Sequence, residues 1–84
     1  MKNNEILKKQ IIYRSIHRGT KEMDILLGRF VRKNIDKLNE ADLVNLNQLL
    51  VIEDEIIFKW YFEKKTDYRI PKNKVSEMLR VFKI

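Results

Sequence analysis

Apolar side chains recur at three- and four-residue spacing along almost the whole of this 84-residue chain. That spacing places them on one side of an α-helix, whereas a half-buried strand needs strict alternation, and no long alternating stretch is present. Only two glycines and one proline interrupt the pattern, and there is no Asn-Gly or Asp-Gly hairpin turn. The sequence therefore predicts an all-α protein, a compact bundle of five short helices with mostly antiparallel neighbours, as a single domain over residues 1–84.

The five helices are expected over about residues 4–17 and 21–32, then after Asn39, after the acidic break at 53–54 and after Pro71. Each carries an apolar stripe that predicts a core face. The expected core positions are Ile6, Leu7, Gln10, Tyr13, Ile16, Met23, Leu26, Leu27, Phe30, Val31, Leu43, Leu46, Leu49, Leu50, Ile56, Ile57, Trp60, Tyr61, Val75, Met78, Leu79 and Phe82. Phe58 and Phe62 flank this stripe, and because Trp60, Tyr61 and these two rings cannot all point inward, one or two belong at the surface.

Several residues are typical of helix ends. Thr20 and Asn39 are expected N-caps, and an acid of the Glu53-Asp54 pair is expected to cap the fourth helix. Pro71 suits the start of the last helix, because proline is tolerated in a first turn. Gly19 ends the first helix, either in a left-handed conformation or where another group approaches its backbone closely.

Charge and composition narrow the class of protein. The chain has 18 basic and 12 acidic residues and a net charge of +6, which favours nucleic acid or an acidic protein as partner. The charges are interleaved, so most of them are expected on a solvated surface. Cysteine is absent, which excludes disulfides and thiolate chemistry and is typical of a reducing cytosol. No apolar run or leader suggests membrane insertion or export.

Catalytic and cofactor motifs are missing from the sequence. His17 is the only histidine, and a lone histidine without ligand partners predicts a helix-end residue or a contact residue and not a metal site. The acids at 53–55 lack the oxygen spacing of a calcium loop. Gly19 and Gly28 stand alone, so there is no phosphate-binding loop. We therefore expect no enzyme activity, no metal and no tightly bound cofactor.

The segment from Tyr13 to Asp24 carries a family resemblance. It contains an aromatic residue six positions before a glycine, then Arg18-Gly19-x-x-Glu22 and an acid at Asp24. An acid-rich break followed by Trp60 lies downstream in the expected order. In these features the chain resembles, over nearly all of its length, the small flavinylation factors of succinate dehydrogenase, called SdhE in bacteria and succinate dehydrogenase assembly factor 2 in mitochondria.

The resemblance implies a five-helix chaperone-like FAD assembly factor that is not itself an enzyme. Such factors bind the flavoprotein subunit of succinate dehydrogenase, and in some bacteria fumarate reductase, and promote covalent attachment of FAD to it. We expect a monomer in the bacterial cytoplasm that acts on the FAD of its partner and does not bind nucleic acid.

We expect partner binding at six residues around the first helix end: Arg14, His17, Arg18, Gly19, Glu22 and Asp24. Of these, Arg18, Gly19 and Glu22 match the family motif, Asp24 is either a second contact or a helix-start acid, and His17 stands where relatives often carry a basic residue. Gly19 would let the partner approach the backbone, and Arg18 would offer a bidentate donor to a partner carboxylate or carbonyl. Glu22 would pair with a partner cation or orient Arg18. In the simpler alternative, Arg18 and Glu22 form only a local i, i+4 surface pair worth about 0.2–0.5 kcal/mol.

Two other functions fit the residues less well. A basic helical domain of this size suits a nucleic-acid binder, but the segment after Gly19 begins with Glu22 and Asp24, which would repel phosphate. An antitoxin-like or generic adaptor protein is the second alternative.

Overall fold

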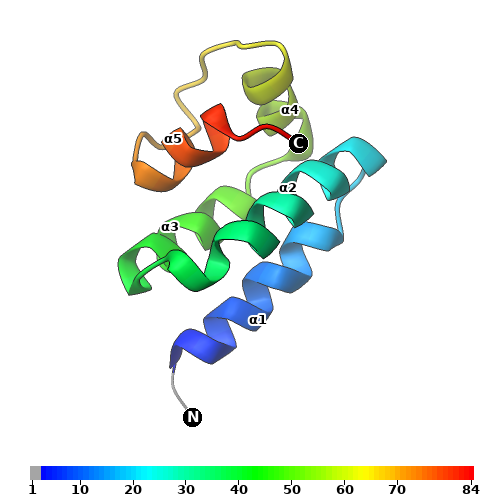
Figure 1. Cartoon of the computed structure of the whole chain (residues 1–84). Coiled ribbons are helices and arrows are strands. Elements are labelled where there is room, and N and C mark those ends of the chain that lie inside the picture. The colour runs from blue at the N-terminus through cyan, green and yellow to red at the C-terminus, as the bar shows by residue number, and fades with distance from the viewer. Residues whose placement is uncertain (1–2) are drawn as a thin grey trace.

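The computed structural model describes residues 3–84, which form five α-helices and no strand (Figure 1). The helices are α1 (Asn3–Ile16), α2 (Lys21–Asn34), α3 (Glu40–Leu50), α4 (Asp54–Phe62) and α5 (Lys74–Val81). A single 3-10 turn, η1 (Ile35–Lys37), extends α2 and was not predicted. The all-α prediction is confirmed. No helix among these residues is both long and apolar enough to cross a membrane.

The core lies between α1, α2 and α3, and α4 and α5 cover one end of it (Figure 1). Phe30 of α2 is completely buried, and its ring meets the ring of Phe82 edge-on at a centroid distance of 5.4 Å. Burial of such side chains is the main favourable term in folding. The buried apolar residues are Ile11, Met23, Leu26, Leu27, Phe30, Val31, Ile35, Leu38, Leu43, Leu46, Leu49, Leu50, Ile57, Trp60, Tyr61, Ile70, Val75 and Leu79.

Helix α1 presents a different face to the core from the one predicted. Ile11 is fully buried and Leu7 packs against the core, whereas Ile6, Tyr13 and Ile16 are 47%, 62% and 46% exposed. Isoleucines occur on several sides of this helix, so its spacing was compatible with two stripes. The stripe that reaches the core steps by four residues, through Leu7 and Ile11 to the buried Ser15.

Prediction and structure agree better in the other helices. All predicted core residues of α2 and α3 are buried. In α4, Trp60 and Tyr61 are buried, Phe58 is half-buried and Phe62 is 38% exposed, so the expectation of surface rings is confirmed. The hydroxyl of Tyr61 donates a hydrogen bond to the carbonyl of Phe82, which fastens the C-terminal segment to α4.

The helix starts show which capping predictions were correct. Thr20 and Asn39 are N-caps whose side-chain oxygens accept hydrogen bonds from the backbone amide of the third residue of the helix, Met23 and Asp42. Glu53 precedes α4 without a side-chain capping bond, so the expected acidic cap is not formed. Pro71 does not start the last helix, because Asn73 and Ser76 form a reciprocal capping box that begins α5 at Lys74.

Candidate functional site

The turn between α1 and α2, here called the corner (residues 18–24), joins two helices that lie side by side (Figure 1). Gly19, Thr20 and Glu22 are exposed. Gly19 does not adopt a positive φ, so the left-handed conformation allowed by the sequence is not the reason for a glycine here. Residues 19–22 of the corner are open to solvent, as a docking surface requires.

Beneath this open backbone, the side chain of Arg18 is buried, with 8% of its surface exposed. Its Nε and Nη2 donate to Oδ1 of Asp54 at 2.8 and 2.6 Å. The remaining hydrogens of Nη1 and Nη2 are directed to the backbone carbonyls of Arg14 (2.9 Å), Leu50 (2.7 Å) and Ile52 (3.3 Å). A guanidinium has five N–H donors, and each of the five has an acceptor within the chain.

The second carboxylate oxygen of Asp54 completes this bracing. Its Oδ2 accepts a hydrogen bond from the backbone amide of Gly19 at 2.6 Å. A Cβ added at Gly19 would lie 3.2 Å from the same oxygen, closer than side chains normally approach. The close approach of Asp54, which lies at the start of α4, therefore favours glycine at this position. The sequence predicted that a group would approach the Gly19 backbone closely, and in the structure Asp54 of the same chain does so.

The two predicted acids differ in their surroundings. Oδ1 of Asp24 accepts a hydrogen bond from the backbone amide of Arg18 at 2.8 Å, so Asp24 also braces the corner. Glu22 is exposed and has no hydrogen-bonded or ion-paired partner within residues 3–84. The local pair between Arg18 and Glu22 does not form, because Arg18 is directed to Asp54 instead. This leaves the Glu22 carboxylate facing solvent.

The end of α1 adds an aromatic flank to the corner. The rings of Tyr13 and His17 stack with their centroids 3.9 Å apart, and Nδ1 of His17 lies 2.8 Å from the carbonyl oxygen of Tyr13. Both residues are exposed, as are Ile12 and Ile16 beside them. Exposed aromatic and apolar side chains that are already held in place are typical of protein-binding surfaces.

Arg14 lies behind this flank and is half-buried. Its Nη1 donates to Oδ1 of Asn47 on α3 at 2.6 Å, and its carbonyl accepts from Arg18. The structure thus brings all six predicted site residues together at one end of α1. All of them except Glu22 make hydrogen bonds within the chain, and the predicted contacts of all six with a partner stay predictions.

Sequence reasoning missed two residues of this site. Asp54 was considered as a helix cap and as part of an acidic break that lacks calcium-loop spacing. Its ion pair with Arg18 was not predicted, although a buried arginine needs such a partner. Tyr13 was assigned to the core, although it lies on the exposed flank. Within the described chain, no group of three or more His, Cys, Asp or Glu side chains is placed to hold a metal ion.

The fold and the site define a small all-α domain with a braced turn and an exposed aromatic flank. Comparison with known proteins identifies which kind. A model of the family described as the flavinator of succinate dehydrogenase matches residues 9–83. The chain belongs to this family.

Named relatives agree with the family. The chain is similar to the mitochondrial succinate dehydrogenase assembly factor 2 of Dictyostelium discoideum, with 39% identity over 84 residues, covering 94% of this chain and 57% of the relative. It is also similar to the FAD assembly factor SdhE of Acetobacter pasteurianus, with 33% identity over 73 residues, covering 87% and 64%. The chain thus spans about three fifths of the length of these relatives. No solved structure is significantly similar to it.

Proposed function

We propose that this chain is an FAD assembly factor that binds the flavoprotein subunit of succinate dehydrogenase and promotes covalent attachment of FAD to it. The observation that carries the proposal is the family match over residues 9–83. The names of the relatives point to the same activity and lend no support to a nucleic-acid binder or an antitoxin-like adaptor.

The proposed action is that of an assembly chaperone and not of an enzyme. The chain holds no tightly bound cofactor and acts on the FAD of its partner, which completes the covalent bond with its own chemistry. We place it as a monomer in the bacterial cytoplasm, with fumarate reductase as a second flavoprotein that it serves.

The six residues at the corner divide into two roles in this proposal. Arg18 and Asp24 hold the corner in shape, and Arg14 supports Arg18 from behind through its carbonyl. Gly19, Glu22 and His17 face the partner, because all three are exposed. A backbone held rigid before binding loses less conformational entropy when the complex forms. The rigid corner therefore supports tight docking.

Gly19→Arg tests the docking role. The new side chain would cover the exposed turn, and its Cβ would press on Oδ2 of Asp54 at 3.2 Å, so the variant should lose binding to the flavoprotein subunit while most of its helicity remains. Gln48→Arg places the same side chain at an exposed position of α3 and serves as the matched control. Circular dichroism measures helicity, and gel filtration measures the complex.

In-gel flavin fluorescence of the flavoprotein subunit, made with and without the chain, tests the activity. The expected result is covalent flavin with the wild-type chain and with Gln48→Arg, and a strong loss without the chain or with Gly19→Arg. Equal covalent flavin in all four samples would show that the chain is not an assembly factor for this subunit.

A further inference from the structure

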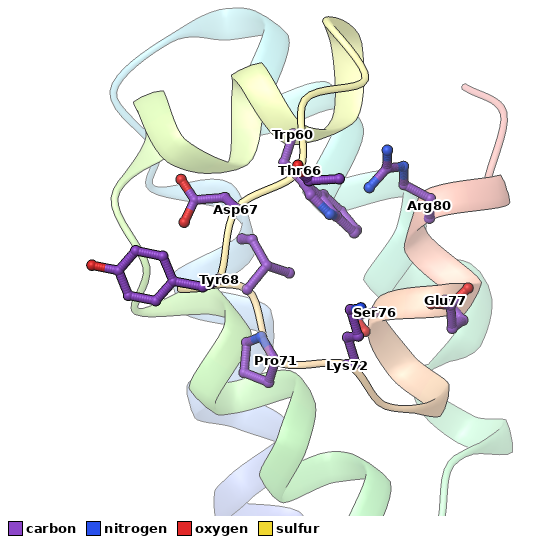
Figure 2. Close-up of a pocket in the computed structure, with 10 residues that line it drawn as sticks. Trp60, Thr66, Asp67, Tyr68, Pro71, Lys72, Ser76, Glu77 and Arg80 are labelled. Carbon is purple, nitrogen blue, oxygen red and sulfur yellow. The ribbon is translucent and has the colours of Figure 1, made fainter.

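A concave surface lies between α5 and the segment that leads into it, far from α1 in the sequence. This hollow has a volume of about 800 Å³. Trp60, Ile70 and Ser76 form its inner wall, and Pro71, Lys72 and Arg80 lie around it (Figure 2). Figure 2 shows the guanidinium of Arg80 directed toward Trp60, whereas the ring of Tyr68 points away to the other side of the segment.

The walls of the hollow are fixed in the free chain. Ile70 is buried and anchors the segment between α4 and α5, and its amide donates to the carbonyl of Asp67 at 3.1 Å. The capping box of Asn73 and Ser76 fixes the start of α5, and Nζ of Lys74 donates to Oδ2 of Asp42 on α3 at 3.2 Å. A site whose walls are already ordered binds at a lower entropic cost.

The charged residues that line the hollow are Lys72, Arg80, Asp67 and Glu77. The C-terminal segment to which they belong, residues 63–84, contains seven basic and three acidic side chains. Two of the acids lie next to basic groups of the same segment, since Asp67 bonds Arg69 at 2.7 Å and Glu63 lies 3.5 Å from Lys65. Glu77 is the remaining acid and lies on the rim of the hollow.

Two cations of the hollow have no acidic partner among residues 3–84. The guanidinium of Arg80 lies 4.8 Å from the ring centroid of Trp60 and makes no ion pair. Lys72 is exposed and also makes none. Arginine stacked on an aromatic ring keeps its N–H donors free along the ring edge. The hollow thus offers two unpaired cations beside the apolar surface of Trp60 and Ile70.

We propose that this hollow binds an extended acidic segment of the flavoprotein partner, as a second contact apart from the corner. A carboxylate of that segment would accept hydrogen bonds from Arg80 and pair with Lys72, and a neighbouring apolar side chain would lie against Trp60 and Ile70. Charge complementarity of this kind steers association and fixes the register of a complex. The inference rests on the proposed function, because it takes the flavoprotein subunit as the partner.

Trp60 is the only tryptophan of the chain, so a fluorinated tryptophan gives one fluorine NMR resonance that reports on the hollow. The experiment adds the flavoprotein subunit to the labelled full-length chain and to labelled Gly19→Arg. We expect the resonance to shift with the wild-type chain in proportion to complex formation. If a duplex oligonucleotide shifts the resonance at physiological salt and the flavoprotein subunit does not, the acidic polypeptide is the wrong occupant.

Lys72→Glu reverses a rim charge without touching the corner, and Lys37→Glu makes the same change at an exposed residue of η1. We expect Lys72→Glu to weaken the complex about tenfold, mainly through slower association, and Lys37→Glu to leave it unchanged. Carbodiimide coupling followed by mass spectrometry should join the Lys72 amine to an Asp or Glu of the flavoprotein subunit.

The outcomes separate the inference from the proposed function. If no complex forms with the wild-type chain, the proposed function fails. If the complex forms but the Trp60 resonance stays fixed, Lys72→Glu binds as tightly as Lys37→Glu and no cross-link reaches Lys72, the inference is overturned while the proposed function stands.

Discussion

Two arginines of this protein have opposite surroundings. Arg18, at the corner, is buried, and all five of its N–H groups have acceptors within the chain. Arg80, at the hollow, lies on the face of Trp60 and has no hydrogen-bonded or ion-paired partner among residues 3–84. Their sequence contexts do not reveal this difference, since both follow an apolar stretch with helical spacing.

The contrast shows that the motif arginine is the less available of the two for a partner. Removing Arg18 from its acceptors would leave the Asp54 carboxylate and three backbone carbonyls without their donor, and such losses are costly in a buried site. Arg80 would gain an acceptor on binding and lose none. The corner thus presents a braced backbone, whereas the hollow presents unpaired charge.

Asp54→Ala should have the largest effect on stability. It leaves the Arg18 guanidinium buried without its carboxylate, and breaking a buried ion pair in this way costs about 3–5 kcal/mol in the free energy of unfolding. Urea denaturation measures the change. Glu55→Ala is the matched control, because Glu55 is exposed and pairs only with Lys59 one turn away, and its loss should cost about 0.3–0.5 kcal/mol.

A double variant sharpens this test. Arg18→Leu combined with Asp54→Ala removes the buried charge together with its partner, so it should be more stable than Asp54→Ala alone. If Asp54→Ala costs no more than Glu55→Ala, the pair is not a structural brace, and Arg18 becomes as free for partner contacts as Arg80.

The two sides of α1 provide the second test, because the aromatic flank beside the corner requires Tyr13 to face outward. Ile11→Ala should lower the free energy of unfolding by about 2–4 kcal/mol, since Ile11 is fully buried. Tyr13→Ser should lower the free energy of unfolding by no more than about 0.5–1 kcal/mol, and it should weaken binding to the flavoprotein subunit. Equal losses of stability in the two variants would mean that the predicted stripe through Tyr13 was the core face after all.

The sequence was sufficient for the fold wherever one apolar stripe dominated a helix. In α2, the stripe from Met23 to Val31 and the Thr20 cap gave both the core face and the start. In α1, isoleucines on several sides made two faces similarly apolar, and only packing against α2 and α3 selects between them.

The site was predictable only in part, for a different physical reason. The corner residues are close in sequence, so a local motif located them. Asp54 lies 36 residues from Arg18, and no local pattern distinguishes a carboxylate that caps its own helix from one that braces a distant turn. The same limit applies to the hollow, whose lining comes from α4, α5 and the segment between them.

Arg80→Met provides the third test and a smaller effect. Methionine retains an apolar chain over Trp60 but removes the charge, so the variant should lose about 0.5–1 kcal/mol of stability from the cation–π contact. Arg29→Met, at an exposed position of α2, is the control for loss of one surface charge. A loss for Arg80→Met as large as that for Asp54→Ala would erase the contrast between the two arginines.

A third arginine lies between these extremes and gives the smallest effect. Arg69 is exposed and binds both oxygens of Asp67, at 2.9 and 2.7 Å. Hydrogen bonds from the Arg69 side chain and backbone lower the pKa of Asp67 from 3.8 to about 2. Because the pKa is lowered in the folded state, the pair contributes to stability above pH 3.8, and the contribution is lost as the pH falls from there to about 2.

Titration of the Asp67 carboxyl carbon by NMR checks this value, with Arg69→Ala as the comparison. The variant should raise the pKa of Asp67 but leave it below 3.8, because the backbone amide of residue 69 still donates to Oδ1 at 2.8 Å. In the variant the negative charge of Asp67 is no longer offset by the bonded Arg69 guanidinium, so the positive potential at the hollow falls. An unchanged pKa of Asp67 in Arg69→Ala would show that Arg69 does not offset the negative charge of Asp67. The hollow would then contain a second free acid beside Glu77, and its preference for an acidic partner would be correspondingly weaker.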